Sequence, residues 1–420
     1  MNIHTSGLDN AYALADSDQT QSFFASSYRC ISATGVFERI TQAVDAKESG
    51  DGDFQQTIEA AFMRAKSKGI ANPILIGAIP FDLSKPSSLV IPQSHEFFSR
   101  SLLVDDKALP ETENIKTPKV LSSRSLPNEA RFKQSVQQAI ANFQLSDIRK
   151  AVLSRILEVE LADKVEVTPI FARLMAQNPS AFHFRLPMTD GSELIGASPE
   201  LLVRKEGDRI FSNPLAGSAK RQADPERDRQ ISESLLQSGK DAYEHHLVIE
   251  DIRAVLTPLC KELTIPDAPS LLGTQAMWHL STGIEGVLSN SAMNVLQVAC
   301  KLHPTPAVCG FPTNLAHKLI KLVEPFERDM FTGMVGWCDA QGNGEWVVTI
   351  RCGRIHHNRI QLFAGAGIVE DSCPESEFAE TQAKLQTMLN ALGVELPGVE
   401  LPAVELARAE TAKPVAENAA

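Results

Sequence analysis

Two kinds of apolar pattern alternate along the chain. Apolar residues that recur every three or four positions predict helices over about 127–144, 167–177, 225–260 and 374–392. Continuous or alternating apolar runs predict strands over 73–81, 151–161, 181–186, 193–197, 201–204, 331–337, 346–351 and 360–367. Because the strands are grouped apart from the helices, the pattern favours an α+β fold over a doubly wound one.

Polar segments separate these elements and close the two ends of the chain. Residues 1–20 are polar and are expected to be flexible, and the proline-containing segment 105–125 is typical of a long surface loop. Residues 394–420 contain a Val-Glu-Leu-Pro repeat followed by Ala, Glu and Lys. Such a segment has too little apolar surface to build a core, so we expect a disordered tail.

Helix boundaries are marked by residues that suit helix ends. Asp224, Glu226 and Asp228 stand near the start of the predicted helix 225–260, where the helix dipole favours acidic side chains. The last helix is expected to begin with Ser372 and Glu375 at capping-box spacing and to stop at Gly393.

Two acidic pairs interrupt the helical pattern. Asp241 and Glu244 have i, i+3 spacing and lead into the apolar stripe of Val248, Ile252, Val255 and Leu259. Glu377 and Glu380 repeat the spacing in the last helix, with Lys384 one turn further on. A solvated helix face is the simpler explanation for either pair alone. Two such pairs together indicate hard oxygen ligands that converge from two helices on Mg²⁺, beside a cation for an anionic substrate.

Composition narrows the class of protein. The 420 residues are 43% apolar, an ordinary globular value, and they carry a net charge of −12 that disfavours nucleic-acid or anionic-membrane surfaces. The seven cysteines form no Cys-x-x-Cys pair, so reduced thiols in a cytoplasmic protein fit better than structural zinc or a disulfide framework. The N-terminal residues lack the pattern of a signal peptide, and no apolar run is long enough to span a bilayer.

Two titratable residues are candidates for acid–base chemistry. Lys150 opens a predicted strand, where a lysine is ordinarily exposed; in a cleft that lowered its pKa, the neutral amine could remove a proton. Glu200 lies in a turn between two apolar runs. It is either a surface acid or a buried carboxyl that stays protonated and serves as a general acid.

Other residues could hold an anion. The glycines near Gly217 and Gly365 match no nucleotide-binding fingerprint, but they allow backbone N–H groups to approach a carboxylate. Arg351 ends an apolar strand and could grip a carboxylate with two bonds. His279 could donate to a substrate oxygen, although a lone histidine is more often structural.

Long ordered motifs from Ile148 to Gly393 resemble the chorismate-utilising enzymes, and among them the isochorismate synthases of the enterobactin, or siderophore, type. The motifs are Lys-Ala-Val-Leu-Ser-Arg, Gly-Ala-Ser-Pro-Glu-Leu-Leu, Pro-Leu-Ala-Gly-Ser-Ala-Lys-Arg, His-Pro-Thr-Pro-Ala, Gly-Asn-Gly-Glu-Trp-Val-Val-Thr-Ile-Arg and Gly-Ala-Gly-Ile-Val. The resemblance implies one α+β domain over 21–393, with large antiparallel sheets packed together and helices outside. Residues 148–393 would form its catalytic core.

The resemblance also implies an activity and the residues that carry it. The activity is the reversible, Mg²⁺-dependent conversion of chorismate to isochorismate for catechol siderophores such as those built on 2,3-dihydroxybenzoate. Lys150 would be the base that activates water, and Glu200 the acid that protonates the departing hydroxyl. The metal would be held by Glu244 and Glu380, assisted by Asp241 and Glu377, although many relatives carry glutamate where this chain has Asp241. The substrate carboxylates would be held by Arg351, Lys384 and the backbone near Gly217 and Gly365, with His279 lining the site.

Residues that differ between members of the family distinguish an isochorismate synthase from the related enzymes. Anthranilate synthases typically carry glutamine where this chain has Lys150, and aminodeoxychorismate synthases carry lysine where it has Ala216, so neither ammonia chemistry nor a glutaminase partner is implied. Salicylate synthases tend to carry threonine, tyrosine and leucine where this chain has Ala307, Phe331 and Ile350. Salicylate synthase, the menaquinone-pathway isochorismate synthase and an inactive binding protein remain alternatives. A monomer is expected.

Overall fold

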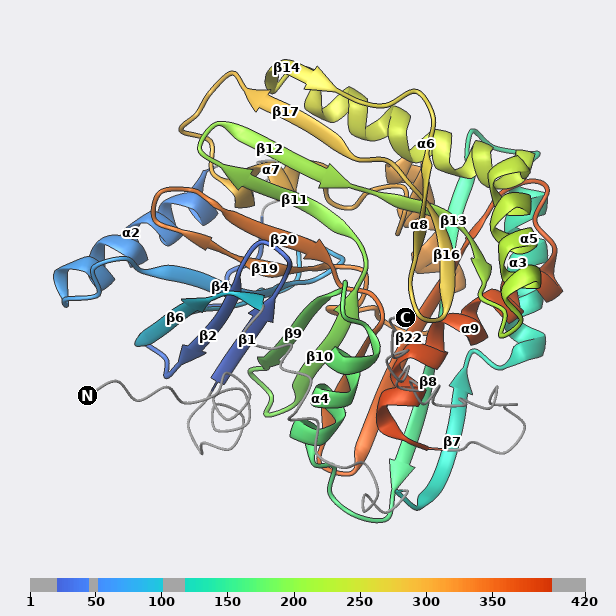
Figure 1. The fold of residues 1–420 in the computed structure, drawn as a ribbon, viewed down its shortest axis with the longest axis horizontal. Helices are drawn as coiled ribbons and strands as arrows, with labels where there is room; N and C mark the ends of the chain where they lie inside the picture. Colours follow the sequence, from blue (N-terminus) through green and yellow to red (C-terminus); the bar gives the residue numbers. More distant parts are fainter. Residues whose placement is uncertain (1–20, 45–51, 101–117, 395–420) are drawn as a thin grey trace, which may run out of the picture.

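Apolar strands pair into two large antiparallel sheets in the computed structural model, which describes residues 21–44, 52–100 and 118–394 (Figure 1). The first sheet has ten strands, in the order β18 (Gly310–Phe311), β8 (Lys150–Leu161), β22 (Arg359–Ile368), β21 (Cys352–His356), β10 (Glu193–Ser198), β9 (Phe182–Pro187), β1 (Gln21–Ala25), β2 (Cys30–Thr34) and β6 (Ser94–Phe98), with β7 (Val120–Leu126) also paired to β8.

The second sheet has nine strands, in the order β14 (Cys260–Thr264), β17 (Ile284–Leu288), β12 (Arg209–Asn213), β11 (Leu201–Glu206), β20 (Gly344–Val348), β19 (Met334–Asp339), β4 (Ile74–Ile79), β5 (Ser88–Ile91) and β3 (Glu38–Ile40). A small third sheet has the order β13 (Leu215–Lys220), β16 (Met277–Ser281) and β15 (Ser270–Gly273). The helices are α2 (Asp53–Ser67), α3 (Glu129–Phe143), α4 (Val167–Gln177), α5 (Pro225–Gln237), α6 (Gly239–Leu256), α7 (Val295–Leu302), α8 (Thr313–Val323) and α9 (Pro374–Leu392).

The two large sheets pack face to face, and helices cover their outer faces. Strand β4 illustrates this packing, because both of its faces are apolar. Ile76 faces a core shared with Phe24 and Phe184 of the other sheet, whereas Leu75 faces a second core that includes Ile58 of α2. Successive side chains point to opposite faces of a strand, so a continuously apolar strand serves both cores. Helices α6 and α7 join α2 on that outer face, and α4 and α9 cover the ten-stranded sheet. The predicted α+β fold is confirmed.

The pairing of β8 with β22 is the contact that positions the site. These strands run antiparallel over ten residue pairs, from Ala151 opposite Ile368 to Glu160 opposite Arg359 (Figure 1). This register brings Lys150, at the start of β8, beside the glycines at the end of β22. The chain then turns directly into α9, so the second acidic pair lies at the same end of the sheet.

Two predictions about helices were wrong. The segment 225–260 is two helices, because Ser238 adopts an extended conformation and its side chain accepts a hydrogen bond from Asp241 N–H to begin α6. The capping box of α9 is absent: its N-cap is Cys373, without a side-chain bond, and Ser372 Oγ instead donates to Glu377 Oε1 at 2.7 Å. The stop at Gly393 is confirmed, with φ of 66°.

Part of the predicted surface loop is a strand. Residues Val120–Leu126 form β7 and pair with β8, whereas 101–117 lie outside the described residues. The prediction was wrong here because β7 is a largely exposed edge strand, in which polar side chains face water while the backbone makes the ladder. The predicted flexible ends, 1–20 and most of 394–420, also lie outside the described residues. None of the described helices combines the length and the apolar character needed to cross a bilayer.

Candidate active site

A pocket at the end of the β8–β22 pair gathers side chains from across the sequence. It is lined by eleven of the predicted site residues, namely Glu200, Gly217, Glu244, His279, Ala307, Phe331, Ile350, Arg351, Gly365, Glu380 and Lys384. The other three do not line it: Lys150 pairs with the pocket residue Glu244, Asp241 lies beside Gly217, and Glu377 stands one turn before Glu380 on α9. The structure thus brings the predicted residues into one region.

Lys150 is buried, although a lysine at a strand end is usually exposed. Its side chain has no exposed surface, and its Nζ lies 3.0 Å from Oε1 of Glu244. Gly367 on β22 makes room for this pair, because a Cβ at that position would lie 2.0 Å from Glu244 Oε1 and 3.0 Å from Lys150 Cε. A buried amine with one acidic partner at the edge of a pocket is suited to proton transfer.

Glu200 occupies the tight turn between β10 and β11 and is 3% exposed. Burial raises the pKa of its carboxyl to about 7, although Lys150, Lys384 and Arg351 act to lower it. The backbone N–H of Leu215 approaches Oε1 at 3.4 Å. A carboxyl with such a pKa holds a proton near neutral pH, which a general acid requires.

The four predicted metal ligands, Asp241, Glu244, Glu377 and Glu380, lie close together, and lysines pair with three of them. Besides the Lys150–Glu244 pair, Lys384 Nζ lies 2.6 Å from Glu380 Oε1, and Lys240 Nζ lies 2.7 Å from Glu377 Oε1. Asp241 accepts a hydrogen bond from Ser238 Oγ. The lysines therefore provide positive charge among carboxylates that would otherwise repel one another.

The pKa values of these acids show the repulsion. Burial, and then the charge of Glu380, raise the pKa of Glu377 to about 7. Burial also raises the pKa of Asp241, with Glu244 and Glu380 adding to the effect. Burial acts to raise the pKa of Glu380, but Lys384, with help from Lys240 and Ser218, lowers it below its ordinary value. An added cation would relieve the mutual repulsion.

The donor chemistry of this cluster suits a hard divalent cation, although no ligand set is assembled. Carboxylate oxygens are the ligands such ions prefer, and Glu377 Oε2 is buried without a hydrogen-bond partner. However, no three Asp, Glu, His or Cys side chains of the described residues are placed together as a metal site, and lysines pair with three of the four carboxylates. A cation here would have to draw carboxylates from their lysines.

Arg351 offers a buried positive charge to an anion. It lies between β20 and β21 with φ of 50°, in the left-handed region, and not at a strand end as the sequence indicated. Within the described part of the chain no acidic side chain forms an ion pair with it. Its Nη2 lies 3.3 Å from His279 Nε2. Because guanidinium only donates, Nε2 of His279 is the acceptor, and a neutral ring then carries its proton on Nδ1.

His279 is held neutral by its surroundings. Burial first, and then the charges of Arg351 and Lys384, keep the pKa of the ring well below its ordinary value. Directly opposite His279 in the β13–β16 pair is Ser218, another pocket residue. Next to it, Gly217 has φ of 79° at a bulge in this pair, and a Cβ there would lie 3.0 Å from Cβ of Asp241. The positive φ and the close approach to Asp241 both exclude a side chain with a Cβ, which explains why this position is glycine.

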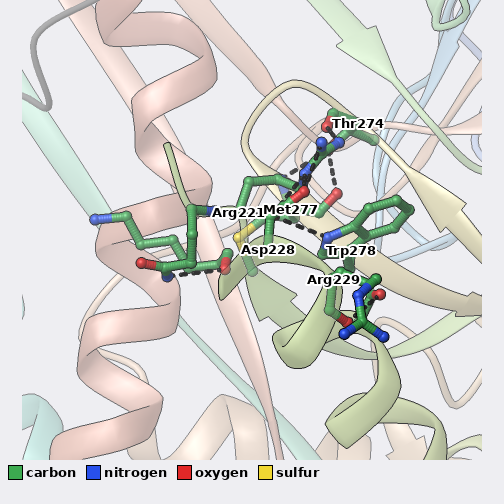
Figure 2. Close-up of polar contacts among 9 residues, drawn as sticks. Arg221, Asp228, Arg229, Thr274, Met277 and Trp278 are labelled. Atoms are coloured by element: carbon green, nitrogen blue, oxygen red, sulfur yellow. Dashed lines mark hydrogen bonds and ion pairs between the residues drawn. The ribbon is translucent and has the colours of Figure 1, made fainter. Parts of the chain in front are cut away.

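Beyond this strand pair, a cluster around Asp228 fastens α5 to the small sheet (Figure 2). Arg221 makes an ion pair with Asp228 at 2.7 Å and lies over the Trp278 ring at 4.2 Å, while Trp278 Nε1 donates to Asp228 Oδ1 at 3.1 Å. The sequence indicated only a helix-dipole role for Asp228. Its position instead supports the strands that carry Ser218 and His279.

An apolar wall completes the pocket. Ala307 and Ile350 line it together with Phe331, whose ring stacks on Phe363 at a centroid separation of 5.1 Å and an interplanar angle of 16°. Sequence reasoning missed Phe363, along with Val152, Ser218, Thr332 and Gly367. Among these residues, Gly367 had a sequence signal, because it is the second glycine of Gly-Ala-Gly. The others lie in strands and loops, where the sequence does not distinguish a pocket residue from a core residue.

Comparisons with known proteins agree on one family. The family described as chorismate binding enzyme matches residues 94–393. The isochorismate synthase EntC of Escherichia coli K12 is 45% identical over 373 residues, which cover 89% of this chain and 94% of that one. The vibriobactin-specific isochorismate synthase of Vibrio cholerae is 41% identical over 385 residues, covering 91% and 94%. Among solved structures, the protein proposed to be the 2,3-dihydroxybenzoate-specific isochorismate synthase DhbC of Bacillus anthracis is similar, with a TM-score of 0.83 and 38% identity over 92% of this chain and all of that one.

Proposed function

Because this chain belongs to the chorismate-binding enzyme family, we propose that it is an isochorismate synthase, an isomerase that exchanges the hydroxyl group of chorismate between ring carbons. The observation that carries the proposal is the placement of a buried lysine and a buried, protonatable glutamate at one pocket that also contains Arg351. The relatives named for vibriobactin and 2,3-dihydroxybenzoate support a role in making catechol siderophores, in preference to the menaquinone pathway.

In the proposed reaction, Lys150 and Glu200 divide the proton transfers. Lys150 takes a proton from the water that adds to the ring, and Glu200 gives its proton to the hydroxyl that leaves. One group has to act as a base and the other as an acid at the same pH. Because the pKa of Glu200 is raised, its carboxyl keeps a proton near neutral pH and can act as the acid. Because similar bonds are made and broken, the reaction is reversible.

The pocket's cations would hold the substrate, which is a dianion. Arg351 has the geometry to bind a carboxylate, and Lys384 and the backbone near Gly217 and Gly365 lie around the same cavity. We further propose that Glu244 and Glu380 are the main ligands of a Mg²⁺ ion, with Asp241 and Glu377 assisting. When bound, that ion would supply positive charge to the ring carboxylate.

The proposal needs neither ammonia nor a second subunit. Water is the nucleophile, so no glutaminase partner is required, and the chain is proposed to act as a monomer. A cytoplasmic location is also proposed, and it is supported by the absence of disulfides among the seven cysteines.

Product analysis tests the function directly. Incubation of the pure protein with chorismate and Mg²⁺ should give a mixture of isochorismate and chorismate with little salicylate, and omission of Mg²⁺ should stop the reaction. The physical reason is the apolar wall of Ala307, Phe331 and Ile350, which offers the enolpyruvyl group no hydrogen bond that would steer it toward elimination. Chromatography of the quenched mixture measures both products. Stoichiometric salicylate and pyruvate, formed at the enzyme's own turnover rate, would instead identify a salicylate synthase.

The pH profile tests the role of Glu200. Its carboxyl is protonated below a pKa of about 7 and ionised above it, so the acid form is lost as the pH rises. We therefore expect kcat/KM for chorismate to fall on the alkaline side, by about tenfold for each pH unit well above this pKa. Initial rates between about pH 6 and about pH 9 would show it. Glu200→Gln has no proton to donate, so a folded Glu200→Gln variant that kept the wild-type rate and pH profile would exclude Glu200 as the acid.

A further inference from the structure

A buried ion pair lies behind the apolar wall of the pocket. Arg328 and Glu324 expose only 2% and 3% of their side chains, and they meet through two parallel bonds, Nε to Oε2 at 2.8 Å and Nη2 to Oε1 at 2.6 Å. Such fork-to-fork pairs are strong and fix the orientation of both groups. Neither residue lines the pocket, and the proposed reaction uses neither of them.

The guanidinium group of Arg328 also forms hydrogen bonds to three walls of the pocket. Arg328 Nη2 donates to the Val152 carbonyl of β8 at 2.7 Å, and Nη1 donates to the Val308 carbonyl at 2.8 Å and to Thr332 Oγ1 at 3.2 Å. Val152, Val308 and Thr332 all line the pocket. One guanidinium thus sets the spacing between a strand and two separate loops.

The loop that carries Phe331 has an unfavourable backbone that this pair helps to hold. Asp329 and Thr332 have φ values of 53° and 58°, in the left-handed region that residues other than glycine rarely adopt. Thr332 N–H donates to the Thr349 carbonyl at 2.8 Å, and its hydroxyl contacts Arg328. A conformation of this kind persists only where surrounding contacts impose it, and such positions cluster at functional sites.

The held loop separates the pocket from water. Phe331 and Phe363, the stacked pair, line the pocket on one side and an outer groove of about 1190 Å³ on the other. Glu324 and Arg328 line the same groove. If the pair were weakened, the loop would relax and the two rings would part, which would leave the enolpyruvyl group free to bring its methylene carbon to the ring hydrogen that elimination transfers.

We propose that the Glu324–Arg328 pair is a positioning device that keeps this wall closed and thereby keeps the enolpyruvyl ether of the product intact. The inference rests on the proposed function. The side reaction that it suppresses is elimination from isochorismate. The hydrogen on the carbon that carries the new hydroxyl moves to the enolpyruvyl methylene carbon, the ring C–O ether bond breaks, and the ring becomes aromatic, so that one isochorismate gives one salicylate and one pyruvate.

The test compares product ratios and not rates. Arg328→Lys keeps the charge but loses the two parallel bonds. Glu324→Gln keeps the shape but loses the charge and one of the two acceptor oxygens. In both variants the ratio of salicylate to isochorismate should rise about tenfold, because a looser wall releases the enolpyruvyl group for elimination while hydroxyl exchange loses alignment, a loss of up to about 10²-fold for a displacement of about 1 Å. Asp82→Asn is the matched control: Asp82 pairs with Lys321 in the same groove without contacting the pocket, so its ratio should equal that of the wild type.

The outcomes separate the inference from the function on which it rests. A purely structural role would lower the fraction of active enzyme and leave the product ratio unchanged, so folded variants that turn over more slowly at the wild-type ratio would overturn the inference alone. Thermal melting identifies the folded variants, and Glu324→Gln keeps the test decisive if Arg328→Lys does not fold. If the wild type makes no isochorismate, the proposed function itself fails.

Discussion

Replacing Lys150 by alanine should lower kcat for isochorismate formation by about 10²–10⁴, the usual cost of losing one acid–base group. The expectation follows from the burial of its side chain at the edge of the pocket and from the ion pair with Glu244, which gives the amine a fixed position. Initial rates measured by chromatography at saturating chorismate and Mg²⁺ provide the comparison. The melting temperature shows whether the fold survives.

A second buried lysine offers a control for the loss of a large buried side chain. Lys205 is 2% exposed on β11 and does not line the pocket, so Lys205→Ala should leave kcat close to that of the wild type even if it lowers the melting temperature. Near-normal turnover in folded Lys150→Ala would remove Lys150 from the role of base. Equal losses in both variants would point to stability as the cause.

Glu244→Ala and Glu380→Ala should each abolish Mg²⁺-dependent turnover. The two carboxylates come from different helices, α6 and α9, and both line the pocket, so either loss would leave a shared ion under-coordinated. Titration of Mg²⁺ against rate, with each variant followed to high metal concentration, measures the effect. The Gln variants keep the shape of each side chain and should fail in the same way, because an amide lacks the negative charge that holds the ion.

Exposed acids on the same two helices serve as controls. Glu250 on α6 and Glu375 on α9 face solvent, and their alanine variants should keep the wild-type Mg²⁺ dependence. If Glu244→Ala or Glu380→Ala also kept it, that residue would not be a ligand. The pairing of these acids with Lys150 and Lys384 would then be a structural arrangement only.

The sequence indicated which residues gather at the pocket better than it indicated the boundaries of the elements around it. The acidic pairs were visible because charge at the head of an apolar stripe conflicts with the helical pattern, and both pairs do lie on helices at the pocket. Lys150 could not be placed by pattern alone, since a lysine that opens a strand is usually exposed. Its burial depends on Gly367, which lies on a strand far along the chain.

Features that depend on contacts between distant segments were not predictable. The break between α5 and α6 is different, because it is local: Ser238 followed by Gly239 is a cap and turn signal that the surrounding helical pattern concealed. Glu324 and Arg328 have i, i+4 spacing that usually indicates a surface pair, and only the fold shows that they are buried against Val152 and Val308. Strand β7 was missed for the opposite reason, because its exposed polar side chains resemble a loop.

The β8–β22 pairing also governs when the molecule can acquire its site during synthesis. Lys150 leaves the ribosome long before Gly367, and the carboxylates of α9 follow later still. Non-local strand pairing is slow, because loop-closure entropy is lost before the contacts form. Until β22 arrives, the apolar strand β8 lacks its main partner, and unpaired strand edges of this kind promote aggregation. No fragment that ends before β22 can assemble the pocket, so a chain whose synthesis stops early would be inactive and prone to self-association.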